Sequence, residues 1–388
     1  MTPLRRVLVI FTVWCAGLGA AAQFAKMSVI YDQLGGIYPD HRGVGIGIMV
    51  SVIGIIGLLF GTTAGVLVTR IGPRRTMLAA LALGAVISLM QSLLPPYSAM
   101  VASRIPEGLS HLAIVVVGPT AMAGAASVRF QGLVMTLWGS FFGLTFTVMA
   151  YFGPSLVALH GPGLLFQFHA VWMVLCLAAL AVLMPADPVR IQARQGSGVL
   201  AQHLATYASP QIAAPAMGFV CYTVTYVAAL TLLPGAVTPG WGGFIAVAMP
   251  LTSIFISLTL GVALLNVISA VEVVQAGFGA AIAAAAGLWL TWGSGAPEAG
   301  FALLLASAMG VVQGASFAMI PQLNPEPAGR AQAAGAIAQL GNLGTTTGTP
   351  LMAVLLARHG VNGLAVFLIG FSMLGIMLHR WQAWRRAV

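Results

Sequence analysis

Long apolar segments, each sufficient to cross a lipid bilayer, recur along nearly the whole chain. A helix needs ~20 mostly apolar residues to cross ~30 Å of hydrocarbon. These segments are too long and too continuous for barrel strands, so the pattern predicts an all-α membrane protein. Breaks at Gly, Pro and charged residues give twelve predicted spans, at 7–30, 43–69, 76–94, 98–122, 132–158, 165–184, 210–234, 241–264, 268–292, 299–322, 331–357 and 362–380.

The composition excludes the main soluble classes of protein. The 388 residues are 59% apolar and only 6% charged, with 16 Lys+Arg against 7 Asp+Glu. A soluble domain carries roughly 25% charged residues. A cytoplasmic enzyme, a nucleic-acid-binding domain and a disordered chain are therefore excluded. The cysteines all lie inside apolar runs, so we expect neither a disulfide framework nor a metal cluster from Cys15, Cys176 and Cys221.

The first apolar run is interpreted as a span. Residues 1–23 resemble a cleavable signal peptide, with Arg5-Arg6 before an apolar stretch and an Ala-rich end. The apolar run nevertheless continues to Ile30, which makes it long enough to cross the bilayer.

The placement of the basic residues predicts the orientation. If the N-terminus is cytoplasmic, twelve of the 16 basic residues fall in inside segments, and the outside loops hold only Arg42 and Arg358. Basic residues are enriched in cytoplasmic loops, so both termini are predicted to be cytoplasmic, in a bacterial inner membrane. The twelve are Arg5, Arg6, Arg70, Arg74, Arg75, Arg129, Arg190, Arg194, Arg330, Arg380, Arg385 and Arg386.

The most polar stretch divides the spans into six and six. We expect an N-terminal bundle at 1–184, a cytoplasmic central loop at 185–209 and a C-terminal bundle at 210–388. An internal repeat at half length is typical of transporter folds. An offset of 196 residues pairs Gly65 with Gly261, Gly118 with Gly314 and Pro154 with Pro350.

Two motifs resemble signatures of the major facilitator superfamily. The end of span two, Gly65-Val66-Leu67-Val68-Thr69-Arg70-Ile71-Gly72-Pro73-Arg74-Arg75, is similar to the cytoplasmic-loop pattern G-x-L-a-D-r-x-G-r-r. Span four contains Arg104 and Gly108 in an R-x-x-x-G pattern. The resemblance covers the whole chain and implies two pseudo-symmetric six-helix bundles and secondary transport. It also implies a gating role for Gly65, Arg70, Gly72, Arg74 and Arg75.

The chain departs from the family pattern at two places. Thr69 stands where the family usually has Asp. Span five has Gly139, Gly143, Gly153 and Pro154, which partly match a pattern typical of proton-driven exporters, but the glycines expected after the proline are absent.

An ionisable residue inside a predicted span costs ~2.5–3.5 kcal/mol on insertion scales, and spans one and four contain a group of them. Arg104, Glu107 and His111 are spaced three and four apart in span four, so they project from one face. Lys26 lies near the outer end of span one. In the family fold both spans line the central cavity, so the resemblance implies that Lys26, Arg104 and Glu107 meet with a net charge near +1.

The excess positive charge predicts an anionic substrate, bound by the guanidinium of Arg104. Glu107 and His111 are the candidates for protonation. The alternatives are a locked Arg104–Glu107 pair, a Lys26 that extends outward towards Asp32, and a His111 that serves only as a helix contact.

Further polar residues at helical spacing are candidate substrate ligands, with interhelical hydrogen bonding as the alternative role. They are Gln23, Tyr222, Tyr226, Gln313, Gln339 and Asn342.

These features predict a secondary active transporter for a small, anionic, organic or inorganic solute, which works by alternating access and is coupled to protons. The alternative is proton-driven efflux of drug-like or amphipathic metabolites. The sequence has no Walker-type loop, no H-E-x-x-H and no G-x-S-x-G, so neither ATP-driven transport nor an enzyme is expected. We expect no cofactor and no nucleic-acid partner. The expected partners are the solute, H⁺ and the lipid bilayer, and the chain is expected to be a monomer.

Overall fold

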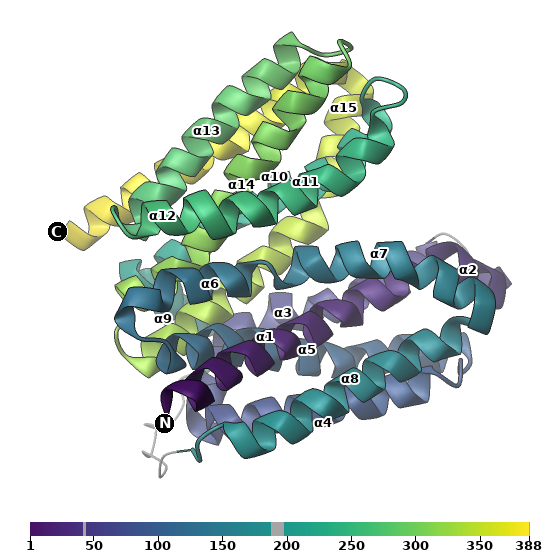
Figure 1. Cartoon of the computed structure of the whole chain (residues 1–388), viewed down its shortest axis with the longest axis vertical. Helices are drawn as coiled ribbons and strands as arrows, with labels where there is room; N and C mark the ends of the chain where they lie inside the picture. The colour runs from purple at the N-terminus through teal and green to yellow at the C-terminus, as the bar shows by residue number, and fades with distance from the viewer. Residues whose placement is uncertain (42–43, 188–197, 388) are drawn as a thin grey trace.

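The computed structural model describes residues 1–41, 44–187 and 198–387, and these are helical almost throughout, with no strand among them (Figure 1). Three of the arginines used to predict the orientation, Arg42, Arg190 and Arg194, lie outside the described residues. A backbone in lipid has no water to bind, and an α-helix satisfies its own N–H and C=O groups. Apolar side chains can face lipid without a polar partner. This composition therefore favours long apolar helices.

The first six spans are formed by seven helices, because span five is divided. They are α1 (Pro3–Ser28), α3 (Val44–Ile71), α4 (Pro73–Gln91), α5 (Tyr97–Ala125), α6 (Gln131–Gly139) with α7 (Phe141–His160), and α8 (Pro162–Leu183). Short helices α2 (Tyr31–Ile37), η1 (Pro39–His41) and η2 (Val128–Phe130) lie in the connections.

The last six spans include one divided span, and the final two are the two parts of α15 on either side of Gly360. They are α10 (Pro210–Ala236), α11 (Gly242–Ile256) with η3 (Ser257–Gly261) and α12 (Val262–Leu265), α13 (Ala270–Leu290), α14 (Ala296–Leu323) and α15 (Pro327–Ala387). The 61 residues of α15 are too many for one crossing, and Gly360 at φ 56° reverses the chain within it. The described residues therefore give twelve crossings, and the predicted fold is confirmed.

Both chain ends lie at the same end of the molecule (Figure 1), as an even number of crossings requires. We call this end the terminal face and the opposite end the far face. At the terminal face, within the predicted central loop, residues 199–208 form the additional helix α9 (Val199–Ala208). The boundaries 1–184, 185–209 and 210–388 stay a prediction.

The start of α4 at the terminal face is capped by a carboxylate from a distant segment. Gly72, the residue before the helix, has φ 102° and no side chain to cap the first turn. Asp187 takes that role: its Oδ1 accepts a hydrogen bond from the Arg74 amide at 2.8 Å, and its Oδ2 accepts one from the Arg75 amide at 3.0 Å. A carboxylate at a helix N-terminus satisfies unpaired amides and interacts favourably with the helix dipole.

Replacing Asp187 by Ala should lower the stability by about 1 kcal/mol, because two amides of the first turn lose their acceptor. The measurement is the melting temperature of the purified protein, with Asp40→Ala as the control because Asp40 is exposed on η1. Equal melting temperatures for the two variants would contradict the capping role.

Candidate functional site

A cluster of buried charges lies inside the first bundle. Lys26 of α1 and Arg104 of α5 share one carboxylate, that of Glu107: Lys26 Nζ lies 2.5 Å from Glu107 Oε1, and Arg104 Nη1 pairs with Glu107 Oε2. All three side chains have no exposed surface. Lys26 and Arg104, which were predicted to meet Glu107, thus each contact its carboxylate.

Neighbouring helices supply hydrogen bonds to this cluster. Gln91 of α4 donates from Nε2 to Glu107 Oε2 at 2.9 Å. Arg104 Nε donates to the Met49 carbonyl of α3 at 3.0 Å. Lys26 Nζ donates to Ser88 Oγ of α4 at 2.6 Å. Lys26 thus points into the first bundle, and the alternative partner, the side chain of Asp32, lies outside the described part of the chain.

His169 of α8, which was not among the predicted site residues, extends the cluster. Its Nδ1 lies 2.6 Å from Ser88 Oγ, and its Nε2 lies 2.8 Å from the Gly19 carbonyl. A carbonyl only accepts, so Nε2 carries the proton and Nδ1 accepts from the serine. His169 has no ionisable neighbour in its own helix. The only signal was its presence within an apolar span.

Two further predicted residues lie next to the cluster on α1 and α5. His111 Nδ1 donates to the Ala20 carbonyl at 2.9 Å, and its ring meets Phe24 edge-on at 5.0 Å. Gln23 Nε2 donates to Ser110 Oγ at 2.9 Å, while its Oε1 has no partner. The contacts of His111 fit its predicted role as a helix contact, and its position beside the charged cluster fits the predicted protonation role.

The cluster is short of negative charge. One carboxylate serves two cations, so its formal charge is +1, and Arg104 Nη2 is buried without a hydrogen-bond partner. A buried ion costs several kcal/mol unless it is paired and hydrogen-bonded. An anion that reached Arg104 could accept from the free Nη2 and neutralise the excess charge.

Two of the remaining predicted ligands, Gln339 and Asn342, lie where the two bundles meet. We call the contact of α3 with the first half of α15 the seam. There the backbones of Gly61 and Gly335 approach so closely that a Cβ on either would meet the other's carbonyl. Gln339 Nε2 donates across the seam to the Leu58 carbonyl at 2.7 Å, and Asn342 lies against Gly54.

Gln313, Tyr222 and Tyr226 belong to the second bundle, apart from the charged cluster. Gln313 of α14 faces Gly139 of α6, at a second contact between the bundles. Tyr222 and Tyr226 stack in α10 with ring centroids 5.4 Å apart, and both are buried. The predicted ligands thus lie in four places: the charged cluster, the seam, the contact of α14 with α6, and the tyrosine pair of α10.

The predicted gating residues lie at the terminal face. Gly65 packs against the backbone of Ala331 in the seam, and Arg70 is exposed at the end of α3. Arg74 donates to the Ala181 carbonyl at 2.6 Å, near the C-terminus of α8, where a cation is favoured. The exposed Arg75 side chain lies 4.0 Å from the carboxylate of Asp187.

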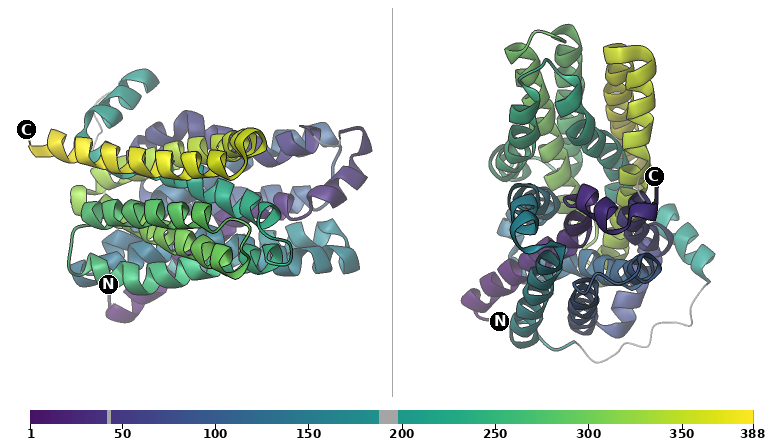
Figure 2. Two further views of the ribbon diagram at one scale, coloured as in Figure 1. Left: turned by 90° about the horizontal axis from the view of Figure 1, so that it is seen from above. Right: turned by 90° about the vertical axis from the view of Figure 1, so that its right-hand side faces the viewer.

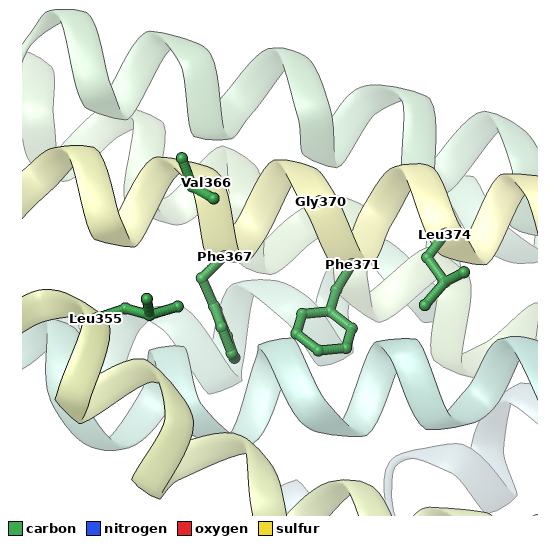
Figure 3. Close-up of a pocket in the computed structure, with 6 residues that line it drawn as sticks. All are labelled: Leu355, Val366, Phe367, Gly370, Phe371 and Leu374. Atoms are coloured by element: carbon green, nitrogen blue, oxygen red, sulfur yellow. The ribbon is translucent and has the colours of Figure 1, made fainter.

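An apolar cavity of about 230 Å³ lies elsewhere, between the two halves of α15 (Figure 3). It is lined by apolar side chains and one glycine, which suits it to lipid chains better than to a polar solute. The lining residues are Leu355, Val366, Phe367, Gly370, Phe371 and Leu374.

The sequence matches the family model described as Major Facilitator Superfamily over residues 9–348. The chain belongs to this superfamily. This confirms the resemblance drawn from the motifs, and family membership makes the chain a membrane transporter. A search of curated proteins finds no match.

Solved structures of the superfamily share the fold at low sequence identity. One is the transporter FucP in the outward conformation, with TM-score 0.77, 14% identity, and coverage of 97% of this chain and 99% of that one. Another is the proton:xylose symporter XylE, with TM-score 0.78, 15% identity and coverage of 99% and 96%. The human organic anion transporter MFSD10 has TM-score 0.73, 18% identity and coverage of 98% and 100%.

The charged cluster predicts unequal effects for its members. Glu107→Gln should lower the free energy of unfolding by about 3–5 kcal/mol, because it leaves two buried cations without a counter-charge. Lys26→Met should cost less, because it leaves a neutral Arg104–Glu107 pair. Denaturant titration of the purified variants measures both, and a larger loss in Lys26→Met would contradict the shared carboxylate.

The seam predicts that Gly335→Val separates the bundles at the terminal face, since its side chain would collide with the Gly61 backbone. Spin-label distances between Leu67→Cys and Glu326→Cys, measured after replacement of the three native cysteines, should lengthen. The matched control is Gly124→Val, at a helical glycine with open space around it. An unchanged distance in Gly335→Val would contradict the role of the Gly61–Gly335 contact in holding the bundles together.

Proposed function

We propose that the chain carries a small anionic solute, organic or inorganic, by alternating access, with protons as the coupling ion. The observation that supports this most strongly is the buried cluster with a formal charge of +1 and a guanidinium nitrogen without a partner. Ionisable residues inside a membrane are costly, and they commonly mark substrate or ion pathways. Anion binding would supply both the missing charge and the missing acceptor.

Access from one side is supported by the position of the seam. The seam comprises residues 54–65 of α3 and residues 331–342 of α15, which lie in the parts of these helices towards the terminal face. Further along α15 towards the far face, side chains such as Thr346, Thr347 and Val354 are exposed. The bundles thus meet at the terminal face, and FucP, whose structure has a similar fold, is described in an outward conformation.

The proposed orientation follows from the arginines. Arg5, Arg74 and Arg385 lie at the terminal face and contact main-chain carbonyls at helix ends. Because basic residues are enriched on the cytoplasmic side, the terminal face is assigned to the cytoplasm of a bacterium. The far face then opens outward, and the chain acts as a monomer in the inner membrane.

Proton coupling is supported by titratable groups in and beside the cluster. Among the described residues, Glu107 supplies the one carboxylate that pairs with both Lys26 and Arg104, so a proton on it would free both cations for an anion. His111 and His169 are hydrogen-bonded beside it. Two proteins with a similar fold are described as proton symporters, of fucose and of xylose, and MFSD10 as an organic anion transporter.

The alternative, efflux of amphipathic compounds, is favoured by one feature. Phe24 of α1 lies near Phe142 of α7, which stacks on Phe146, and the three rings are only partly buried. Such rings could bind the apolar part of a substrate.

The first test is a thermal-shift screen of the purified protein against lactate, benzoate, phosphate, xylose and a quaternary ammonium dye. A ligand that binds the native state raises the melting temperature. The proposal predicts shifts with the anions and their loss in Arg104→Ala, while Arg358→Ala, at an exposed far-face arginine, retains them. A shift with the dye alone would favour the efflux alternative.

Transport is then measured in proteoliposomes with the anion that gives the largest shift. Accumulation should require an imposed pH gradient and collapse with an uncoupler, while exchange of labelled for unlabelled anion persists. Undiminished transport by Arg104→Ala would contradict the assigned role of the cluster.

A further inference from the structure

Helix α9 exposes an apolar side and turns a polar side towards the protein, which is the reverse of a surface helix in water. Its outward residues, which are exposed, are all apolar. They are Leu200, Ala201, Leu204, Ala205 and Ala208, with Leu200 73% and Leu204 64% exposed. A surface helix of a soluble protein shows the opposite arrangement, with apolar residues towards the core.

The inward side of α9 is polar and is hydrogen-bonded to both bundles. His203 Nδ1 lies 2.8 Å from Thr62 Oγ1 of α3, and His203 Nε2 lies 3.0 Å from Gln339 Nε2 of α15. Tyr207 donates to Gln339 Oε1 at 2.7 Å. Thr206 is buried on the same side. Polar groups therefore face the protein and apolar groups face away from it.

The hydrogen bonds place α9 at membrane depth. Thr62 lies nine residues before the terminal-face end of α3, which is ~13 Å along the helix. A helix of 28 residues is ~42 Å long and exceeds ~30 Å of hydrocarbon by ~6 Å at each end. The contact with His203 is therefore several ångströms inside the hydrocarbon boundary.

The surroundings of α9 match the edge of the bilayer. Ala208 at its C-terminal end accepts a hydrogen bond from Arg385, whose guanidinium lies over the ring of Trp381 at 5.0 Å. Trp and Arg are typical of the membrane interface. Leu59 and Phe60 of α3, next to the contact, are 52% and 42% exposed, as lipid-facing residues are. Figure 2 shows α9, in teal, standing out from the packed spans.

We propose that α9 lies in the lipid leaflet on the terminal-face side, with Leu200 and Leu204 among acyl chains. The partner is the bilayer itself, and the polar side of the helix then joins both bundles at the seam in a place that water does not reach. A hydrogen bond withdrawn from water is stronger than one at an aqueous surface. The lipid leaflet thus holds the helix that links the bundles on their closed side. This does not depend on which solute is carried.

The test measures the surroundings of spin labels at Leu200→Cys and Leu204→Cys, after replacement of Cys15, Cys176 and Cys221. The protein is placed in vesicles of palmitoyl-oleoyl phosphatidylethanolamine and phosphatidylglycerol. Oxygen partitions into lipid and a nickel chelate into water, so their relaxation effects distinguish the two. The lipid reference is Leu175→Cys on α8, and the water reference is Glu326→Cys, both at exposed positions.

The expected ratio of oxygen to nickel relaxation at positions 200 and 204 is close to that at 175 and several-fold above that at 326. A ratio like that at 326 would place α9 in water and overturn the proposal. Weak relaxation by both reagents would show that another protein surface, such as a second copy, covers the helix, and would overturn it too.

A second variant separates lipid contact from the hydrogen bonds. His203→Ala removes the contacts with Thr62 and Gln339 but leaves the apolar side intact. The label at 204 should become more mobile and keep its high oxygen ratio. A change to strong nickel relaxation would show that the apolar side has no affinity for lipid of its own, and the assignment would fail.

Discussion

Inside a bilayer a polar group has no water to bind, so every such group must find its partner within the protein. This constraint accounts for most of the specific contacts of the chain. The carboxylate of Glu107 pairs with two buried cations and accepts from Gln91. Ser88 accepts from Lys26 and in turn bonds to His169. The exceptions, such as Arg104 Nη2, are therefore the positions where a visiting ligand would gain most.

The same constraint acts between the bundles. Glycines at the seam let the backbones of α3 and α15 touch, and Gln339 supplies a hydrogen bond across them. The side chain of Gln339 also accepts from Tyr207. Its amide is thus engaged near the terminal face, where it contributes to holding the bundles together. Asp187 and the terminal-face arginines satisfy helix ends in a similar way.

Much of the fold was predictable because its signal is local. Each span needs only a sufficient length of apolar residues, and the breaks at Gly, Pro and Arg mark the ends, so twelve crossings could be counted. The break between the last two spans was predicted at 358–361, and the chain reverses there at Gly360. Residues 199–208 were predicted as part of a loop, because a polar, aperiodic stretch precedes them. The apolar residues of α9 also face away from the protein, so they do not form the core-facing pattern of a typical surface helix.

The site was predictable only in part. The spacing of Arg104 and Glu107 on one helix gave their contact, since residues three apart share a face. His169 and Ser88 come from helices far along the chain, and no spacing could join them to Lys26. The sequence by itself determined that this protein lies in lipid, crosses it twelve times and keeps rare charges inside. Only the tertiary structure decided which groups those charges meet, because partners in a helix bundle are set by packing between distant segments.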